Sequence, residues 1–160
     1  MLYKPPYLFS EFSNLHFRMY QPSKDLSPDK DRSLLDAIKQ NKLDEVISLI
    51  ENGVDINPET KDWTISPLQV AIYLGHEEIA KTLILKGAKT NMQDSDGIYP
   101  IHSAVWKNQR EIVEILLQYG ADIEAEYDNL SSTPIAYATS SGSIEMVELL
   151  LHYGAKSIYL

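Results

Sequence analysis

Cysteine is absent from this chain of 160 residues. Its absence excludes disulfide frameworks, thiolate zinc sites and cysteine nucleophiles, and it leaves the redox state of the compartment open. Long apolar runs are also missing, because charged residues or glycine interrupt each one, so we expect no transmembrane helix. Residues 1–17, MLYKPPYLFSEFSNLHF, contain two prolines and a glutamate where a signal peptide needs an unbroken apolar stretch. We therefore expect a cytoplasmic protein.

Basic residues are few. The chain has 14 Lys and Arg against 23 Asp and Glu, which gives a formal net charge of -9. Nucleic acid recognition depends on Lys and Arg that neutralise phosphates, so the deficit argues against a nucleic acid partner and favours a basic protein partner. The hydrophobic content of 44% and the charged content of 23% are typical of a globular chain with a buried core.

Signatures of catalysis are missing as well. The sequence has no GxGxxG, GxxxxGK[ST] or GxSxG motif, and the serines near Ser131 and Ser140 have no base in register. No histidine pair has metal-ligand spacing, and the acidic pairs Glu77/Glu78 and Glu111/Glu114 are typical of a solvated helix face. We predict no catalytic residue, no metal site and no cofactor, so the protein is not expected to be an enzyme.

What the sequence does contain is an internal repeat. Pro67, Pro100 and Pro134 recur at spacings of 33 and 34, and a glycine follows each proline 20 residues later. Between them, each copy has the apolar pattern of two short helices, with proline at the first helical position and glycine after the second helix. Small residues at Ala71, Ala104 and Ala138 let neighbouring helices approach closely. The buried stripes of the second helices predict that each copy must stack on its neighbours.

The repeated segments resemble the ankyrin repeat. Its pattern, D-x-x-G-x-T-P-L-H-x-A-A followed by G-H, an E-I-V-x-L-L run and G-A-D-I-N, is matched by DSDGIYPIHSAV, GHEEIAKTLILKGAKTN, EIVEILLQYGADIE, STPIAYA and SIEMVELLLHYGAK. The resemblance covers residues 33–158 and includes an earlier copy without the proline, in which Ala37 and Gly53 are in register and Ser33 can cap a helix. It implies an all-α solenoid of four helix-turn-helix units linked by hairpin fingers.

Residues 1–32 lie outside the repeat pattern and form a predicted N-terminal arm and linker, followed by a repeat domain over residues 33–160. All three phenylalanines, Phe9, Phe12 and Phe17, lie in the arm. Disordered segments are poor in aromatic residues, and a terminal repeat leaves an apolar face without a neighbour. We expect the arm to fold back and cap the first repeat.

Some positions depart from the family pattern. Tyr99 replaces the threonine that precedes the proline, while Gln69 and Ala136 replace the histidine that His102 keeps. The hydroxyl-to-imidazole bond that the family pattern implies is therefore expected to be missing in all three copies with proline. This predicts repeats of modest stability.

The fingers, residues 58–66, 91–99 and 124–133, are acidic, and Lys61 is their one base. Acidic residues also suit tight turns, so a purely structural role and a binding role stay equally open for them. Their acidic residues are Glu59, Asp62, Asp94, Asp96, Glu124, Glu126 and Asp128.

The two tryptophans occupy positions that, in the proteins this chain resembles, lie on the surface and contact partners. Aromatic residues frequently anchor protein interfaces, which favours a binding role over the alternative that these rings brace adjacent fingers. The residues predicted to bind a partner are Asp62, Trp63, Ile65, Tyr73, Leu74, Asp96, Ile98, Trp106, Lys107, Asn129, Leu130, Ser140 and Ser141.

The function expected from these features is non-catalytic protein binding. We expect a small inhibitor or immunity-type protein, monomeric when free, that masks a basic partner through a concave acidic and aromatic face. The alternative is an adaptor or scaffold that tethers two partners and needs a second binding surface.

Overall fold

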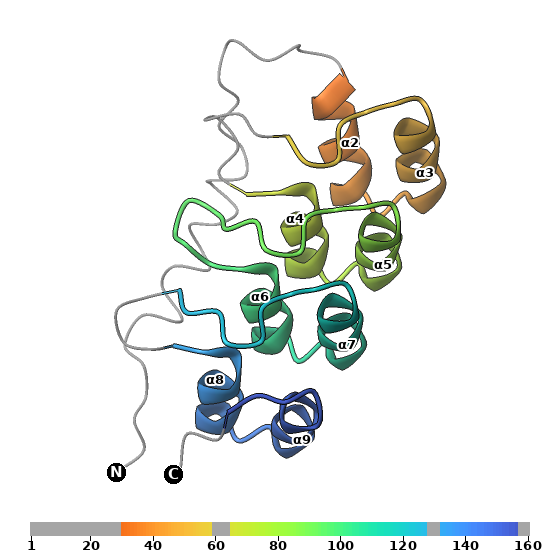
Figure 1. The fold of residues 1–160 in the computed structure, drawn as a ribbon. Coiled ribbons are helices and arrows are strands. Elements are labelled where there is room, and N and C mark those ends of the chain that lie inside the picture. Colours follow the sequence, from red (N-terminus) through yellow and green to blue (C-terminus); the bar gives the residue numbers. More distant parts are fainter. Residues whose placement is uncertain (1–29, 59–64, 128–131, 157–160) are drawn as a thin grey trace.

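The computed structural model describes residues 30–58, 65–127 and 132–156, and these form four pairs of antiparallel helices. No strand occurs within these ranges. The stacked pairs confirm the predicted helical solenoid (Figure 1). The pairs are α2 (Lys30–Lys39) with α3 (Leu43–Glu51), α4 (Pro67–Leu74) with α5 (Glu77–Leu85), α6 (Pro100–Trp106) with α7 (Arg110–Gln118), and α8 (Pro134–Ser141) with α9 (Ile144–His152).

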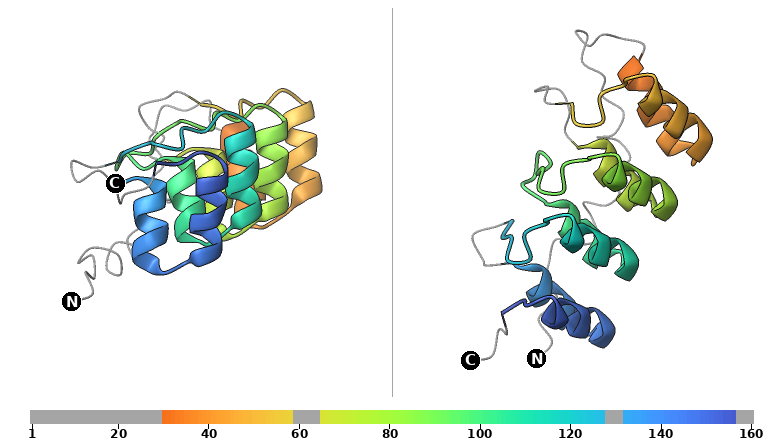
Figure 2. Two further views of the ribbon diagram at one scale, coloured as in Figure 1. Left: turned by 60° about the horizontal axis from the view of Figure 1, so that its bottom comes forward. Right: turned by 45° about the vertical axis from the view of Figure 1, so that its right-hand side comes forward.

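The helices lie in two layers. The inner helices α2, α4, α6 and α8 form one row, and the outer helices α3, α5, α7 and α9 form the other (Figure 2). The connectors between pairs project on the side of the inner helices (Figure 1). A surface made by the fingers and the inner helices therefore draws residues from every pair of the stack.

The prolines begin three inner helices, as predicted. Ser66 caps α4 with a reciprocal capping box, in which its hydroxyl accepts from the Gln69 backbone N–H, and Thr133 caps α8 by accepting from Ala136 N–H. Tyr99 precedes α6 and makes no capping bond through its side chain. The sequence therefore specifies the start of α6 through Pro100 rather than through a cap.

The turn between the two helices of each pair needs a left-handed residue at one shared position. Gly75 and Gly142 occupy it with φ of 77° and 74°, and Asn41 and Asn108 occupy it with φ of 55° and 54°. Asparagine tolerates this conformation better than most residues with a side chain. The matched geometry keeps all four pairs in the same relative orientation.

The core runs without interruption through the stack. Of the residues predicted to form the buried stripes of the outer helices, Ile79, Leu83, Ile112 and Leu116 are fully buried, whereas Leu151 on the last helix is 45% exposed. The small residues Ala71, Ala104 and Ala138 lie where α4, α6 and α8 pack closely. Each side chain of this size contributes about 1.5–3 kcal/mol when buried. One pair alone would leave these side chains in water, so the stack stabilises every pair.

The first helix differs from the prediction at its start. Helix α2 begins at Lys30, inside the segment expected to be a linker, so Ser33 lies within the helix. The expectation that Ser33 caps this helix is wrong. The N-terminal arm and its predicted contact with the first repeat lie outside the described residues.

Gln69 supports the junction between the second and third repeats. Its Nε2 donates to the Ile98 carbonyl oxygen at 2.7 Å, and its Oε1 accepts from the Ser66 hydroxyl at 3.1 Å. At the next junction, His102 Nε2 lies 3.0 Å from the Ser132 carbonyl oxygen, and its side chain is also fully buried. In the repeat of Gln69, the amide therefore takes the place of the imidazole both within the repeat and across the junction. The modest stability of the repeats stays a prediction.

Polar side chains form hydrogen bonds between the connectors of successive repeats. Asn57 donates to the Gly87 carbonyl oxygen and accepts from Lys89 N–H, and Asn91 donates to the Gly120 carbonyl oxygen and accepts from Asp122 N–H. At the last junction, Glu124 accepts from Lys156 N–H at 2.7 Å. These bonds fix the spacing between successive fingers.

Candidate protein-binding face

Six residues at the carboxyl ends of the inner helices form a row across three repeats, which we call the helix-end row. They occupy the sixth and seventh positions after the repeated proline. Tyr73 and Trp106 are half-buried, whereas Leu74 is 39% exposed. The row consists of Tyr73, Leu74, Trp106, Lys107, Ser140 and Ser141, and Lys107 and the two serines are exposed.

One contact within this row joins two repeats. Lys107 Nζ lies 4.8 Å from the centroid of the Tyr73 ring, within the range of a cation–π interaction. Tyr73 is on α4 and Lys107 follows α6, so residues 34 apart in the sequence meet on this face. The face therefore already holds one cation against an aromatic ring.

Trp106 lies in a group of five rings that we call the aromatic cluster, made of Tyr99, His102, Trp106, Tyr127 and Tyr137. The Trp106 ring meets Tyr127 edge-on, with centroids 5.5 Å apart and planes at 85°, and lies 5.6 Å from Tyr137. His102 lies 5.0 Å from Tyr127 and 5.8 Å from Tyr99. Trp106 thus braces the next finger, which was the alternative to a binding role, and it also retains partial exposure. Its binding role stays a prediction.

Tyr137 lies partly buried within the cluster. Burial raises the pKa of its hydroxyl, and the neighbouring Tyr127 raises it further. The Tyr137 hydroxyl is therefore neutral at ordinary pH and presents a polar group rather than negative charge.

The acidic residues of the fingers differ in their contacts and exposure. Asp94 Oδ1 accepts from the backbone N–H groups of Asp96 and Ile98, each at 2.9 Å, and so forms the turn of its finger. Glu124 is engaged with Lys156 N–H, whereas Asp96 and Glu126 have exposed side chains. The acidic character of the fingers is thus partly required by the turns.

The structure describes nine of the residues predicted to bind a partner. Eight of them, on the inner helices and one finger, are at least partly exposed, and one is not. Ile65 is 9% exposed and packs in the core, so its side chain is not available as surface. Ile65 and Ile98 each lie two residues before the proline of their repeat, but Ile98 is only half-buried. Asp62, Trp63, Asn129 and Leu130 lie outside the described residues.

Three rings of the aromatic cluster were missed from the sequence. The repeat pattern marks Tyr99 only as a position without a capping threonine, and it does not single out Tyr127 or Tyr137. Tyr137 follows Pro134 by three residues, one turn before the position that Trp106 has in its own repeat, which is a signal that the repeat register offers. Tyr127 lies in a finger, where no helical period indicates which way a ring points.

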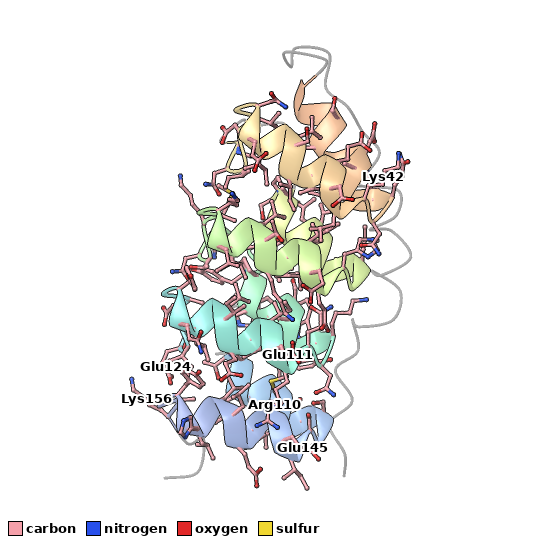
Figure 3. The ribbon with its side chains drawn as sticks, turned by 90° about the vertical axis from the view of Figure 1, so that its right-hand side faces the viewer. Lys42, Arg110, Glu111, Glu124, Glu145 and Lys156 are labelled. Atoms are coloured by element: carbon pink, nitrogen blue, oxygen red, sulfur yellow. The ribbon has the colours of Figure 1, made fainter. Side chains whose placement is uncertain are left out.

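The outer helices have a different chemistry. Lys81 Nζ lies 2.6 Å from Glu111 and 3.1 Å from Glu78, and these bonds raise the pKa of Lys81 to about 12. The bond with Lys81 lowers the pKa of the Glu111 carboxyl group. In Figure 3 the outer helices face the viewer, with Arg110 and Glu111 in the first turn of α7 and Glu145 in the first turn of α9. Charge pairing between repeats gives this face a structural role.

The described ranges contain no group of three or more His, Asp or Glu side chains that could hold a metal ion. In the same part of the chain, no helix is long and apolar enough to cross a membrane.

Comparison with known families identifies the repeats. The family profile described as "Ankyrin repeats (3 copies)" matches residues 15–94, 34–127 and 68–158, in overlapping placements. Ankyrin repeats are protein–protein interaction modules.

Three curated relatives illustrate the range of proteins that carry such repeats. The chain is 35% identical over 113 residues to ankyrin repeat protein nuc-2 of Neurospora crassa, covering 69% of this chain and 10% of that protein. It is 26% identical over 139 residues to an ankyrin repeat protein of Rickettsia bellii, and the match covers 70% of this chain and 58% of that protein. It is also 32% identical over 113 residues to glycerophosphocholine phosphodiesterase gde1 of Schizosaccharomyces pombe, and the match covers 70% of this chain and 10% of that protein. The chain spans less than two thirds of the length of each.

Proposed function

The chain belongs to the ankyrin repeat family, and from this premise we propose that it is a non-catalytic inhibitor, of the immunity type, that binds a basic partner protein. The proposed binding face consists of the helix-end row, the aromatic cluster and the exposed acids of the fingers. The partner's active or nucleic-acid-binding surface would be masked by this contact. The observation that carries the proposal is the row itself, with half-buried Tyr73 and Trp106 beside the exposed Leu74.

The exposure of these side chains supports binding. Tyrosine and tryptophan are frequent anchors of protein interfaces, where polar groups surround them and exclude water. Here the exposed side chains of Asp96, Lys107, Glu126, Ser140 and Ser141 supply polar groups on the same side of the stack. The arrangement has the composition of an interface with an aromatic centre and a polar rim.

The charge of the chain supports a basic partner. The net charge of -9 attracts a basic surface at long range and repels an acidic one. Electrostatic attraction of this kind mainly accelerates association, and added salt screens it. We therefore expect the association rate constant to fall as the salt concentration rises.

Inhibition is favoured over the adaptor role because the aromatic cluster and the acidic fingers share one side of the molecule. One basic partner on that side would cover both features, which suits a complex of one partner with one chain. An adaptor needs a second independent surface. The glycerophosphocholine phosphodiesterase relative is about ten times longer than the segment that matches this chain. The shared repeats therefore give no reason to assign its phosphodiesterase activity to this chain.

Affinity purification from the native host, followed by mass spectrometry, tests the proposal. We expect one basic protein in a one-to-one complex, and loss of that protein's measured activity when the purified chain is added. Recovery of two different proteins that bind simultaneously would instead support the adaptor. Recovery of an acidic partner would contradict the proposed face.

A further inference from the structure

Helix α9 lies at the end of the stack of described helices and carries exposed apolar side chains (Figure 1). Ile144 is 69% exposed, Leu151 is 45% exposed and Val147 is only partly buried. These three residues follow one another at spacings of three and four, so they share one side of the helix. We call them the end stripe.

The repeat register identifies the end stripe as a stacking surface. Counted back from the glycine that follows each outer helix, Val147 matches Val113 and Ala80, and both of these are fully buried. Leu151 matches Ile84, which is 1% exposed. The fourth repeat therefore keeps apolar residues at positions that the second and third repeats bury.

The junction between α5 and α7 shows what covers this side of an outer helix. Ile84 is buried there, and Lys81, three residues earlier, contacts Glu111 of α7 at 2.6 Å. An apolar side chain with an ion pair beside it thus joins one outer helix to the next. In α9, Leu151 takes the place of Ile84, and Glu148, with an exposed side chain, takes the place of Lys81. The charge is reversed, so the matching group on whatever covers α9 is a base.

The inner helix of the fourth repeat is not equipped to hold a further repeat in the same way. Gln69 and His102 each contact a carbonyl oxygen in the next connector. Ala136 occupies the same position after its proline and has no polar group in its side chain. The apolar part of the junction is therefore kept in the fourth repeat, whereas this hydrogen bond to a following repeat is lost.

Ile144 brings the end stripe close to the proposed binding face. The second and third repeats have charged residues, Glu77 and Arg110, at its position. Terminal repeats normally have a polar outer face, so an exposed isoleucine in place of a charge favours a contact with another molecule. Ile144 follows Ser141 of the helix-end row by three residues, across the turn between α8 and α9. The end stripe thus continues the proposed face around the end of the stack.

We propose that the end stripe binds an amphipathic helix of the basic partner protein, which stacks on α9 as α7 stacks on α5. Apolar side chains of that helix pack on Val147 and Leu151, and a lysine or arginine pairs with Glu148. The inference rests on the proposed function for the identity of the partner, and it adds a second contact beside the helix-end row. Because the two surfaces adjoin, one partner reaches both.

The test uses two synthetic peptides and the full chain. The first peptide has about 16 residues of alanine, leucine and lysine, a length that supports an isolated helix, with leucine along one stripe and lysine beside it. The second peptide has glutamate in place of every lysine. Fluorescence anisotropy of the labelled peptides measures both affinities. We expect the lysine peptide to bind at least about ten times more tightly, because its charge complements Glu148 and the acidic chain.

Paired substitutions separate the end stripe from the general attraction of an acidic chain for a basic peptide. Ile144→Lys combined with Leu151→Lys should weaken binding of the lysine peptide at least about tenfold, because apolar contact is lost and like charge is added. The matched control, Leu85→Lys combined with Tyr119→Lys, adds the same charge at two exposed apolar residues outside the stripe and should weaken binding less than about threefold. Circular dichroism checks that both variants keep their helices, which is expected because all four side chains are exposed.

A second pair of variants tests the predicted ion pair. Glu148→Gln should weaken binding of the lysine peptide about two to five times, as expected for an exposed pair. Glu51→Gln makes the same change at an exposed glutamate on α3, far along the stack from α9, and should leave the affinity nearly unchanged. Equal effects of the two substitutions would contradict the pairing with Glu148.

Three results would overturn the inference. The first is equal weakening by the two paired variants, or equal affinity for the two peptides. The second is a native chain that sediments as a dimer and becomes a monomer on Ile144→Lys with Leu151→Lys, which would assign the stripe to a second copy of the chain. The third is tighter binding of the lysine peptide after deletion of residues 157–160, which would assign the stripe to that segment.

The partner captured from the host distinguishes this inference from the proposed function. If that partner binds the Ile144→Lys, Leu151→Lys variant as well as the native chain but fails to bind Trp106→Ala, the proposed face stands and the contact at the end stripe falls. If the lysine peptide binds as expected and no basic partner is captured, the end stripe stands as a site for basic helices and the proposed function falls.

Discussion

Gln69 is the side chain whose replacement should affect the fold most sharply for its size. It is fully buried, and its amide connects the start of α4 with the Ile98 carbonyl oxygen of the next repeat. The Gln69→Leu substitution nearly keeps the side-chain volume but removes every hydrogen bond of the Gln69 amide group. The Ile98 carbonyl oxygen still accepts from Asp94 N–H, whereas the buried Ser66 loses the acceptor for its hydroxyl.

The expected loss follows from these bonds. A typical hydrogen bond contributes about 0.5–1.5 kcal/mol, and a buried donor left without a partner costs about 1–3 kcal/mol. We expect Gln69→Leu to lower the free energy of unfolding by about 2–4 kcal/mol, a large part of the stability of a small domain. Urea denaturation followed by circular dichroism measures this difference.

Two controls make the result interpretable. Gln40→Leu makes the same substitution at an exposed glutamine that directly follows α2 and should change the stability by less than about 0.5 kcal/mol. Gln69→His should recover part of the loss, because His102 makes the equivalent contact with the Ser132 carbonyl oxygen at the next junction. A Gln69→Leu variant as stable as the native chain would refute the role assigned to this amide.

Three further predictions concern the stack. Asn91→Ala removes two hydrogen bonds between connectors and should lower the free energy of unfolding by about 1–2 kcal/mol in urea denaturation; no change would mean that these exposed bonds contribute nothing. Glu111→Gln should bring the pKa of Lys81 down from about 12 toward 10.5, which NMR titration of the lysine measures. Because the ion pair lowers the pKa of Glu111, the stability that the pair contributes is present above the ordinary glutamate pKa and is lost as the pH falls through the folded-state pKa of Glu111. The melting temperatures of the native chain and the variant should therefore converge in acid, and a difference that does not change with pH would contradict the pairing. Deleting residues 1–24 should lower the melting temperature markedly, because each aromatic side chain buried by a capping arm contributes about 1.5–3 kcal/mol; an unchanged melt would mean that the arm does not cap the first repeat.

The repeat period was sufficient to predict the fold. Proline and glycine at a constant separation mark both ends of each helix pair, and the apolar stripes indicate which faces are buried. Such signals are local and recur in each copy, so an error in one copy is corrected by the others. Ser33 shows the limit, since the first copy lacks the proline and its helix begins earlier, at Lys30.

The candidate site was less accessible to sequence reasoning. The helix-end row follows from the register, because position on a regular helix determines the face on which a side chain lies. Ile65 and Tyr127 lie in irregular connectors, where burial depends on how one finger packs against the next repeat. Gln69 was read as the loss of a histidine because the pattern compares residue types, whereas an amide and an imidazole can donate to the same carbonyl group.

The most direct test of the central claim compares two aromatic residues, Trp106 and Tyr119, in the complex with the captured basic partner. Trp106 belongs to the proposed face, whereas Tyr119 follows the outer helix α7 and is 50% exposed. Isothermal titration calorimetry should find that Trp106→Ala weakens the complex by about 1–2 kcal/mol or more, while Tyr119→Ala leaves the affinity nearly unchanged. Native affinity in Trp106→Ala, with its helices intact by circular dichroism, would contradict binding through this face.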